Sequence, residues 1–284
     1  MKQNKSNRMK IWHAMRIAMT LAVALAFIIA SAGSARAESK KPSIVLVHGA
    51  WADASSWNGV TARLQEDGYT VYAVPNPLRG LSSDAAYVAS ILNTVTGPII
   101  LVGHSYGGAV ITNAATGNPN VKALVYIDAF VPDQGESLLQ LASTPPPPGQ
   151  PASCLGGDPT AVFNFVPYPG AQNGDLDLYI KPELYPSCFG NDIPVRQAAI
   201  LAASQRPIAF SALLEPSGTP AWKTIPSWYL VGTLDKVIPP YAQIFMAQRA
   251  NANIIKVKAS HPAMISHLSA VANLIEKAAR ETAN

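Results

Sequence analysis

The chain has few of the residues on which several classes of function depend. Only 13% of its 284 residues are charged, and neither a long run of charge nor an internal repeat is present. Its five histidines are scattered, and the sequence contains no H-E-x-x-H motif and no paired C-x-x-C motif. Glycine-rich loops that bind nucleotides are also absent. The sequence therefore predicts no metal site and no nucleotide site.

An apolar run long enough for an ordinary membrane span is also missing. Residues 17–30 form a mostly apolar run of 14 residues, whereas a spanning helix needs about 20. Five basic residues precede or begin this run, and the pattern Ala35-Arg36-Ala37 follows it, which is typical of a cleaved signal peptide. We expect residues 1–37 to be a signal peptide and the protein to be periplasmic or secreted. An uncleaved anchor is the alternative, which the well-placed cleavage pattern disfavours.

The positive charge of the chain lies in this same segment. The full sequence has 21 Lys and Arg against 17 Asp and Glu, and residues 1–37 hold six of the basic residues and no acidic one. Residues 38–284 therefore carry a formal net charge of −2. Because the excess of basic over acidic residues is confined to the predicted targeting segment, it gives no reason to expect nucleic-acid binding.

Cysteine is scarce, and the two cysteines are Cys154 and Cys188. An exported protein matures in an oxidising compartment, where such a pair can form a disulfide. Both residues lie in one irregular stretch of the sequence, so we favour a disulfide. Two buried free thiols remain the alternative.

The most informative stretch that is present runs from residue 98 to residue 110. Four apolar residues, 99–102, predict a strand buried on both faces of a parallel sheet. The pattern G-x-S-x-G follows at residues 103–107, and a helical pattern comes next. Glycines two positions before and after Ser105 relieve the crowding of a tight strand-to-helix turn. In this context the motif indicates a nucleophilic serine at an exposed tip.

Strands and helices alternate along most of the chain. Apolar strands are expected at residues 43–48, 70–74, 99–102, 122–127, 225–231 and 253–258. This alternation predicts an α/β fold with a mostly parallel, doubly wound sheet, formed by a single domain over residues 38–284. From about 132 to 211 the pattern breaks down, and four consecutive prolines occur at 145–148. We expect this insertion to form a lid or cap of short helices and loops.

Three residues with side chains suited to nucleophilic catalysis follow the ends of predicted strands. Ser105, Asp235 and His261 come in the order of the α/β-hydrolase fold, and ligands bind at the carboxyl edge of such a sheet. A serine hydroxyl needs a base to take its proton, and the imidazole base needs a carboxylate to orient it. The order therefore predicts Ser105 as nucleophile, His261 as base and Asp235 as acid. Asp128, which also follows a strand, is the rival acid.

The remaining histidines and the oxyanion site can be assigned by position. His48, His104 and His267 are expected to have structural roles. The amide of Tyr106, at a helix N-terminus, is one expected oxyanion donor. The loop after the first strand supplies the second donor in this architecture, and Ala50 is preferred there over Trp51.

Taken together, several motifs resemble the α/β-hydrolase superfamily. They are His48-Gly-Ala-Trp51, residues 103–108, Tyr126-Ile-Asp-Ala-Phe-Val-Pro132, Gly232-Thr-Leu-Asp235 and Ser260-His261. The sequence is most similar to the small esterases related to plant methyl-salicylate esterases and hydroxynitrile lyases. Lyases of this branch carry lysine after the catalytic histidine and lack the glycine of the first motif. Here Pro262 and Gly49 occupy those positions, which favours an esterase.

The resemblance implies a cofactor-free enzyme acting on a small-molecule ester. We expect a serine hydrolase that cleaves carboxylic esters through an acyl-enzyme intermediate. A C–C hydrolase, lactonase or perhydrolase with the same triad is an alternative, and a non-catalytic small-molecule receptor is another. Five aromatic residues of the insertion are candidates for lining the pocket or for packing as core: Phe163, Phe165, Tyr168, Tyr179 and Tyr185. The sequence leaves the acyl-chain preference and the oligomeric state open.

Overall fold

The computed structural model describes residues 9–10, 12–13, 15 and 41–283. Of the predicted signal peptide, only those five positions are described, and they are helical. Its cleavage site lies outside the described residues, so the signal peptide stays a prediction. Within the described residues, no helix combines the length and the apolar character needed to cross a membrane. The unit that begins at residue 41 contains all the strands of the described chain.

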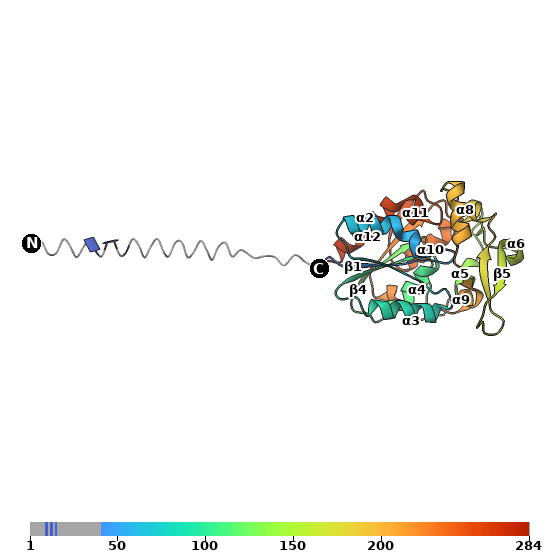
Figure 1. The fold of residues 1–284 in the computed structure, drawn as a ribbon, viewed down its shortest axis with the longest axis horizontal. Helices are drawn as coiled ribbons and strands as arrows, with labels where there is room; N and C mark the ends of the chain where they lie inside the picture. The colour runs from blue at the N-terminus through green and yellow to red at the C-terminus, as the bar shows by residue number, and fades with distance from the viewer. Residues whose placement is uncertain (1–8, 11, 14, 16–40, 284) are drawn as a thin grey trace, which may run out of the picture. The chain divides into compact units, whose positions relative to one another are not determined.

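A six-stranded parallel sheet forms the centre of this unit (Figure 1). Its strands lie in the order β2-β1-β3-β4-β8-β9, and every neighbouring pair is parallel. Their bounds are β2 Val71–Val74, β1 Ser43–Val47, β3 Ile99–His104, β4 Val121–Ile127, β8 Ser227–Gly232 and β9 Asn253–Val257. The prediction of a mostly parallel, doubly wound sheet is confirmed.

Both faces of the sheet are covered by helices, which explains why the central strands are apolar throughout. Ile44 and Leu46 of β1 pack into one apolar cluster, whereas Val45 and Val47 pack into another on the opposite face. Figure 1 shows α2, α11 and α12 on one side and α3 and α4 on the other. Their bounds, with η1 and α10, are η1 Ala54–Trp57, α2 Asn58–Glu66, α3 Leu81–Leu92, α4 Tyr106–Ala114, α10 Pro240–Arg249, α11 Ala263–Ser266 and α12 Leu268–Glu281.

Two helical regions on this sheet are interrupted. The region after β1 consists of a 3₁₀ turn, η1, followed by α2. The region at the C-terminal end is broken at His267, whose dihedral angles of −131° and 42° are not helical. As a result α11 contains only four residues after Pro262, and α12 is the longer, amphipathic helix.

The insertion, which we call the cap and define as residues 132–214, contains more than short helices and loops. It also holds a three-stranded antiparallel sheet in the order β5-β6-β7. Its elements are α5 Leu138–Ala142, α6 Pro159–Val162, β5 Phe163–Pro167, β6 Leu176–Ile180, α7 Tyr185–Cys188, α8 Val195–Ser204, β7 Ile208–Ala209 and α9 Phe210–Leu214. The sequence prediction was wrong to leave out these strands, which are at most five residues long. A 3₁₀ turn, η2 (Ala221–Lys223), follows the cap.

Candidate active site

Ser105 occupies a sharp turn between β3 and α4. Its φ of 53° and ψ of −124° lie in a region that non-glycine residues rarely adopt. A Cβ at Gly103 would lie 2.5 Å from the carbonyl oxygen of Gly107, and one at Gly107 would lie 2.5 Å from that of Val47. The two motif glycines therefore allow the turn to close and to rest against β1.

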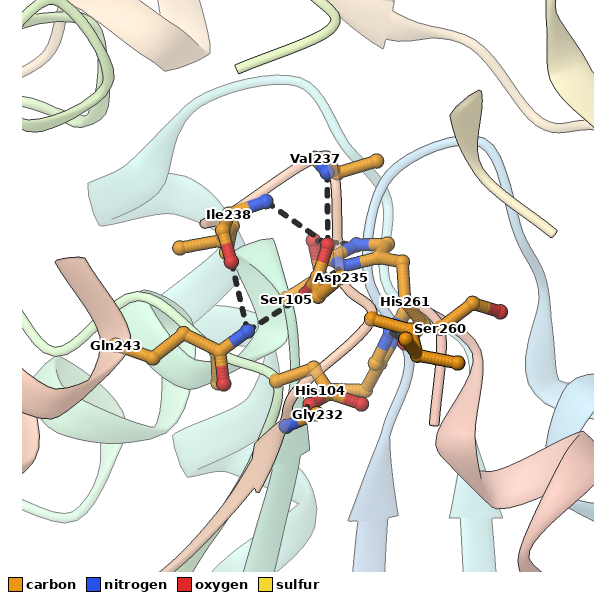
Figure 2. Close-up of polar contacts among 12 residues, drawn as sticks. His104, Ser105, Gly232, Asp235, Val237, Ile238, Gln243, Ser260 and His261 are labelled. Atoms are coloured by element: carbon orange, nitrogen blue, oxygen red, sulfur yellow. Dashed lines mark hydrogen bonds and ion pairs between the residues drawn. The ribbon is translucent and has the colours of Figure 1, made fainter. Parts of the chain in front are cut away.

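Three predicted site residues meet in one hydrogen-bonded chain. His261 Nε2 lies 2.9 Å from Ser105 Oγ, and His261 Nδ1 lies 2.8 Å from Asp235 Oδ2 (Figure 2). All three are almost completely buried, with exposed fractions of 2% for Ser105, 0% for His261 and 3% for Asp235. A neutral imidazole fits both contacts, because Nδ1–H then donates to the carboxylate while Nε2 accepts from the hydroxyl.

Asp235 is held by donors from its own loop and from α10. Its Oδ1 accepts from the amides of Val237 at 2.7 Å and Ile238 at 3.0 Å. Gln243 Nε2 donates to Oδ2 at 2.7 Å and also to the carbonyl oxygen of Ile238 (Figure 2). With His261, four donors face this carboxylate and stabilise its negative charge. Gln243 was not found from the sequence, where no motif marks it.

Asp128, the rival acid, occupies a different position. It is fully buried, and its Oδ1 accepts from the amide of Gly232 at 2.6 Å. Its Oδ2 has no hydrogen-bond partner within the described chain. Burial, followed by the negative charge of nearby Asp235, raises the pKa of Asp128 well above its usual range. The Asp128 carboxyl therefore holds its proton more strongly than an ordinary aspartate, and the histidine bond is made by Asp235 instead.

Two other histidines are buried in neutral form. His104 Nε2 donates to the carbonyl oxygen of His261 at 3.0 Å, and burial next to His261 holds the pKa of His104 well below its usual value. His48 Nδ1 donates to the carbonyl oxygen of Gly49, and its Nε2 accepts from the amide of Asn76. Burial lowers the pKa of His48 to about 4. Both side chains act as structural hydrogen-bonding groups, in keeping with the sequence expectation.

The two amides expected to bind an oxyanion border the same cavity as the serine. Ala50 and Tyr106 line this cavity together with Ser105. In the part of the chain that the structure describes, neither amide donates to another protein atom. The amide of Trp51, the runner-up, is occupied, because it donates to the carbonyl oxygen of Arg206 at 2.9 Å. The geometry therefore leaves the preferred pair free to bind a ligand.

Gly49 has a steric role beside Ser105. A Cβ at this position would lie 2.6 Å from Ser105 Cβ and 2.9 Å from the carbonyl oxygen of His104. Real Cβ contacts are not that short, and the nearest atoms belong to the rigid turn. Only glycine lets the loop after β1 approach the serine turn so closely.

The cap contacts the loops that carry Asp235 and His261. Asp192 accepts from the amide of Ser260 at 2.9 Å and from its hydroxyl, directly before His261. Asn191 Nδ2 donates to the carbonyl oxygen of Leu234, directly before Asp235, at 3.2 Å. His267 Nδ1 lies 3.5 Å from the same Asp192 carboxylate. These cap residues were not found from the sequence.

A disulfide joins two of the cap segments that contact the loop carrying Asp235. Cys154 and Cys188 are bonded to each other. The Cys154 amide donates to the carbonyl oxygen of Lys236 at 2.8 Å, and Ser153 Oγ donates to that of Val237 at 2.7 Å. Since Cys188 ends α7 only three residues before Asn191, the bond links both sets of contacts.

The cavity above Ser105 has a volume of about 420 Å³. None of the residues that line it is charged, and most are apolar. Of the five cap aromatics considered from the sequence, Phe163 and Phe165 line this cavity. Tyr185 does not line it but is buried, and its hydroxyl donates to the carbonyl oxygen of Trp51 at 3.0 Å. Among the described residues, no cluster of three or more His, Cys, Asp or Glu side chains is arranged to hold a metal ion.

Known proteins resemble this chain in both sequence and fold. The model of the Alpha/beta hydrolase family matches residues 44–274. A carbendazim hydrolyzing esterase of Nocardioides sp. (strain SG-4G) is 37% identical over 135 residues, which cover 43% of this chain and 56% of that protein. Methylesterase 1 of Arabidopsis thaliana is 24% identical over 241 residues, which cover 77% of this chain and 88% of the relative.

A solved structure shows the same fold over nearly its whole length. The crystal structure of polyneuridine aldehyde esterase superposes with a TM-score of 0.71 at 19% identity, covering 84% of this chain and 98% of that one. At this identity the likeness concerns the fold. The match with the Nocardioides esterase spans just over half of that protein. The expected resemblance to plant methylesterases is confirmed, and the chain belongs to the alpha/beta hydrolase family.

Proposed function

We propose that the protein is a carboxylic ester hydrolase that works through an acyl-enzyme intermediate. The observation that carries this proposal is the unbroken hydrogen-bonded chain from Ser105 through His261 to Asp235, beside an uncharged cavity. Relatives named as esterases, among them Methylesterase 1, support the same reaction class.

In the acylation step, Ser105 Oγ attacks the carbonyl carbon of the ester while His261 Nε2 takes the hydroxyl proton. The carbonyl oxygen becomes negative and accepts hydrogen bonds from the amides of Ala50 and Tyr106. Asp235 holds the imidazole in the correct tautomer and stabilises its positive form. When the tetrahedral intermediate collapses, the bond to the alcohol oxygen breaks, and His261 gives that oxygen its proton.

Deacylation repeats this sequence with water as the nucleophile. His261 Nε2 takes a proton from water as the water oxygen attacks the acyl carbon. Collapse of the second intermediate breaks the bond to Ser105 Oγ, which recovers its proton from the imidazole. The free acid leaves, and the starting protonation states are restored. No cofactor is needed for either step.

Export from the cytoplasm belongs to the same proposal. The predicted signal peptide over residues 1–37 supports it, as does the disulfide between Cys154 and Cys188, a bond that persists mainly in oxidising compartments. Expression of the full chain followed by N-terminal sequencing of the mature protein tests this part. A mature chain that begins at residue 38 is expected, and an intact N-terminus would contradict cleavage there.

The reaction itself is tested by hydrolysis of p-nitrophenyl butyrate. Ser105→Ala is expected to lower kcat by at least about 10⁴-fold, because the other triad members cannot replace the nucleophile. Ser143→Ala is the matched control, since Ser143 lines the same cavity but has no contact with the triad. A Ser105→Ala variant with unchanged kcat would contradict the nucleophile assignment.

A fluorophosphonate probe separates the alternative functions. Labelling of Ser105 without turnover of any ester in a broad panel would favour a C–C hydrolase, lactonase or perhydrolase with the same triad. Folded protein that neither reacts with the probe nor hydrolyses esters would favour a small-molecule receptor.

A further inference from the structure

A second cavity of about 220 Å³ adjoins the cavity above Ser105. It lies between the proline-rich segment of the cap and helix α10. Seven residues line both cavities, among them Phe130, Val237 and Tyr241. Because these residues border both spaces, the second cavity lies directly beside the cavity above Ser105.

The walls that belong to the second cavity alone are entirely apolar. They are Leu141, Pro147, Ile238, Pro239, Ala242, Phe245 and Met246. No charged side chain lines this space. A charged group placed there would lose its hydration without gaining a partner, whereas an alkyl or aryl group would leave water for apolar surroundings. The chemistry of the walls therefore selects a neutral, apolar occupant.

One wall of the second cavity is conformationally restricted. Pro145 and Pro147 form one wall, and each proline ring fixes the φ angle of its residue. The segment that follows is bonded to the loop that carries Asp235, because Ser153 Oγ donates to the carbonyl oxygen of Val237 at 2.7 Å. The disulfide at Cys154 anchors the same segment to α7. A preformed wall spares a ligand the cost of ordering it.

An exposed aromatic side chain marks the rim of this cavity. Phe245 is 56% exposed, although large apolar side chains are usually buried. It stands on α10 one turn after Tyr241, which lines both cavities. Exposed apolar surface next to a concave apolar site is typical of a ligand-binding region.

We infer that the second cavity is a subsite for one extended apolar arm of the ester whose carbonyl group lies at Ser105. The inference rests on the proposed ester hydrolysis and assigns its substrate class: neutral esters in which one side, acyl or alcohol, carries a medium-length alkyl chain or an aryl group. Each methylene that enters the subsite raises kcat/KM by up to about fourfold, until the space is filled.

The test fills the second cavity and leaves the first unchanged. Ala242 lines only the second cavity, so Ala242→Trp is expected to block it. Gln248→Trp adds the same side chain at an exposed position of the same helix and lines neither cavity. Two substrate series are measured with each variant: p-nitrophenyl esters with acyl groups from acetyl to dodecanoyl, and alkyl acetates from methyl to decyl.

Ala242→Trp is expected to keep kcat/KM for the shortest esters within about twofold of the wild type. It should lower kcat/KM by at least about tenfold for the long members of one series, since two or more methylenes lose their site. The series that responds identifies the arm. Gln248→Trp should leave both series unchanged. Unchanged chain-length profiles in folded Ala242→Trp, verified by thermal denaturation, would overturn the subsite.

A second variant guards against misfolding of the first. Phe245→Ala removes the exposed rim without placing a new group in the protein, and it should lower kcat/KM severalfold for long esters only. Equal losses for short and long esters would contradict the inference. Failure of the proposed function looks different, because Ser105→Ala would then retain hydrolysis of short esters whatever the state of the subsite.

Discussion

Replacing Asp192 with alanine tests whether the cap helps to position the catalytic histidine. The Asp192 side chain is only 10% exposed, and its carboxylate accepts from both the amide and the hydroxyl of Ser260. Ser260 is fully buried and directly precedes His261. We predict that Asp192→Ala lowers kcat, although the residue does not contact the reacting atoms.

The magnitude follows from the bonds that are lost. Hydrogen bonds to a charged group contribute about 1.5–3 kcal/mol each, and the two Ser260 donors would be left buried without a partner. We therefore expect Asp192→Ala to lower the free energy of unfolding by about 3 kcal/mol. A displacement of His261 by about 1 Å can cost about 100-fold in rate, so kcat should fall about 10- to 100-fold while KM changes little.

The assay combines kinetics with a double-mutant cycle. Hydrolysis of p-nitrophenyl butyrate and urea unfolding are measured for Asp192→Ala, Ser260→Ala and the double variant. A coupling energy of about 1 kcal/mol or more is expected, because the two residues share a hydrogen bond. His267→Gln is the control, since it removes the 3.5 Å contact with Asp192 and the bond to Ser266 Oγ but leaves both bonds from Ser260 to Asp192 in place. Folded Asp192→Ala with wild-type kcat would refute the positioning role.

Two further predictions concern the residues around the triad. Gly49→Ala should lower kcat by at least about 100-fold in the p-nitrophenyl butyrate assay, because its Cβ would lie 2.6 Å from Ser105 Cβ. Asp128→Asn should keep kcat near the wild-type value, whereas Asp235→Asn should lose about 10⁴-fold, since the bond to His261 comes from Asp235. Asp128→Asn should also become more stable relative to the wild type as pH rises in thermal denaturation. Because the pKa of Asp128 is higher in the folded than in the unfolded state, the folded state binds more protons between the two pKa values, and wild-type stability falls as pH rises through that range.

For each of these predictions, a specific result would contradict it. Wild-type kcat in Gly49→Ala would mean that the serine turn tolerates a closer neighbour than the structure allows. A loss of activity in Asp128→Asn with retention in Asp235→Asn would reverse the assignment of the acid. A stability difference between Asp128→Asn and the wild type that does not change with pH would contradict the raised pKa of Asp128.

The central sheet and the convergence of the three site residues could be predicted because their signals are local. Strands buried on both faces are apolar throughout, and the G-x-S-x-G pattern specifies its own turn. Since parallel strands end at one edge, residues such as Asp235 and His261 are brought together by topology alone. The sequence does not separate Asp128 from Asp235, because both residues follow strands. In the structure, the hydrogen bond to His261 distinguishes the two carboxylates.

The supporting residues could not be predicted because they act across long sequence separations. Asp192 bonds to a residue 68 positions away, and no motif or spacing connects the two. In the sequence, Gln243 cannot be distinguished from other polar residues of a helix. Only the structure shows that its side-chain amide donates to the carboxylate of Asp235. The cap strands are too short to show a clear alternating pattern of apolar residues. They form through pairing with one another, which the sequence does not reveal.

The most direct measurement of the central claim is the mass of the protein during turnover. Wild-type protein is mixed with p-nitrophenyl acetate, quenched in acid within the first turnovers, and analysed by mass spectrometry before and after proteolysis. The account predicts one added acetyl group, located on the peptide that carries Ser105 and absent from Ser105→Ala. Continuing hydrolysis with no covalent adduct, or with an adduct on another residue, would contradict it.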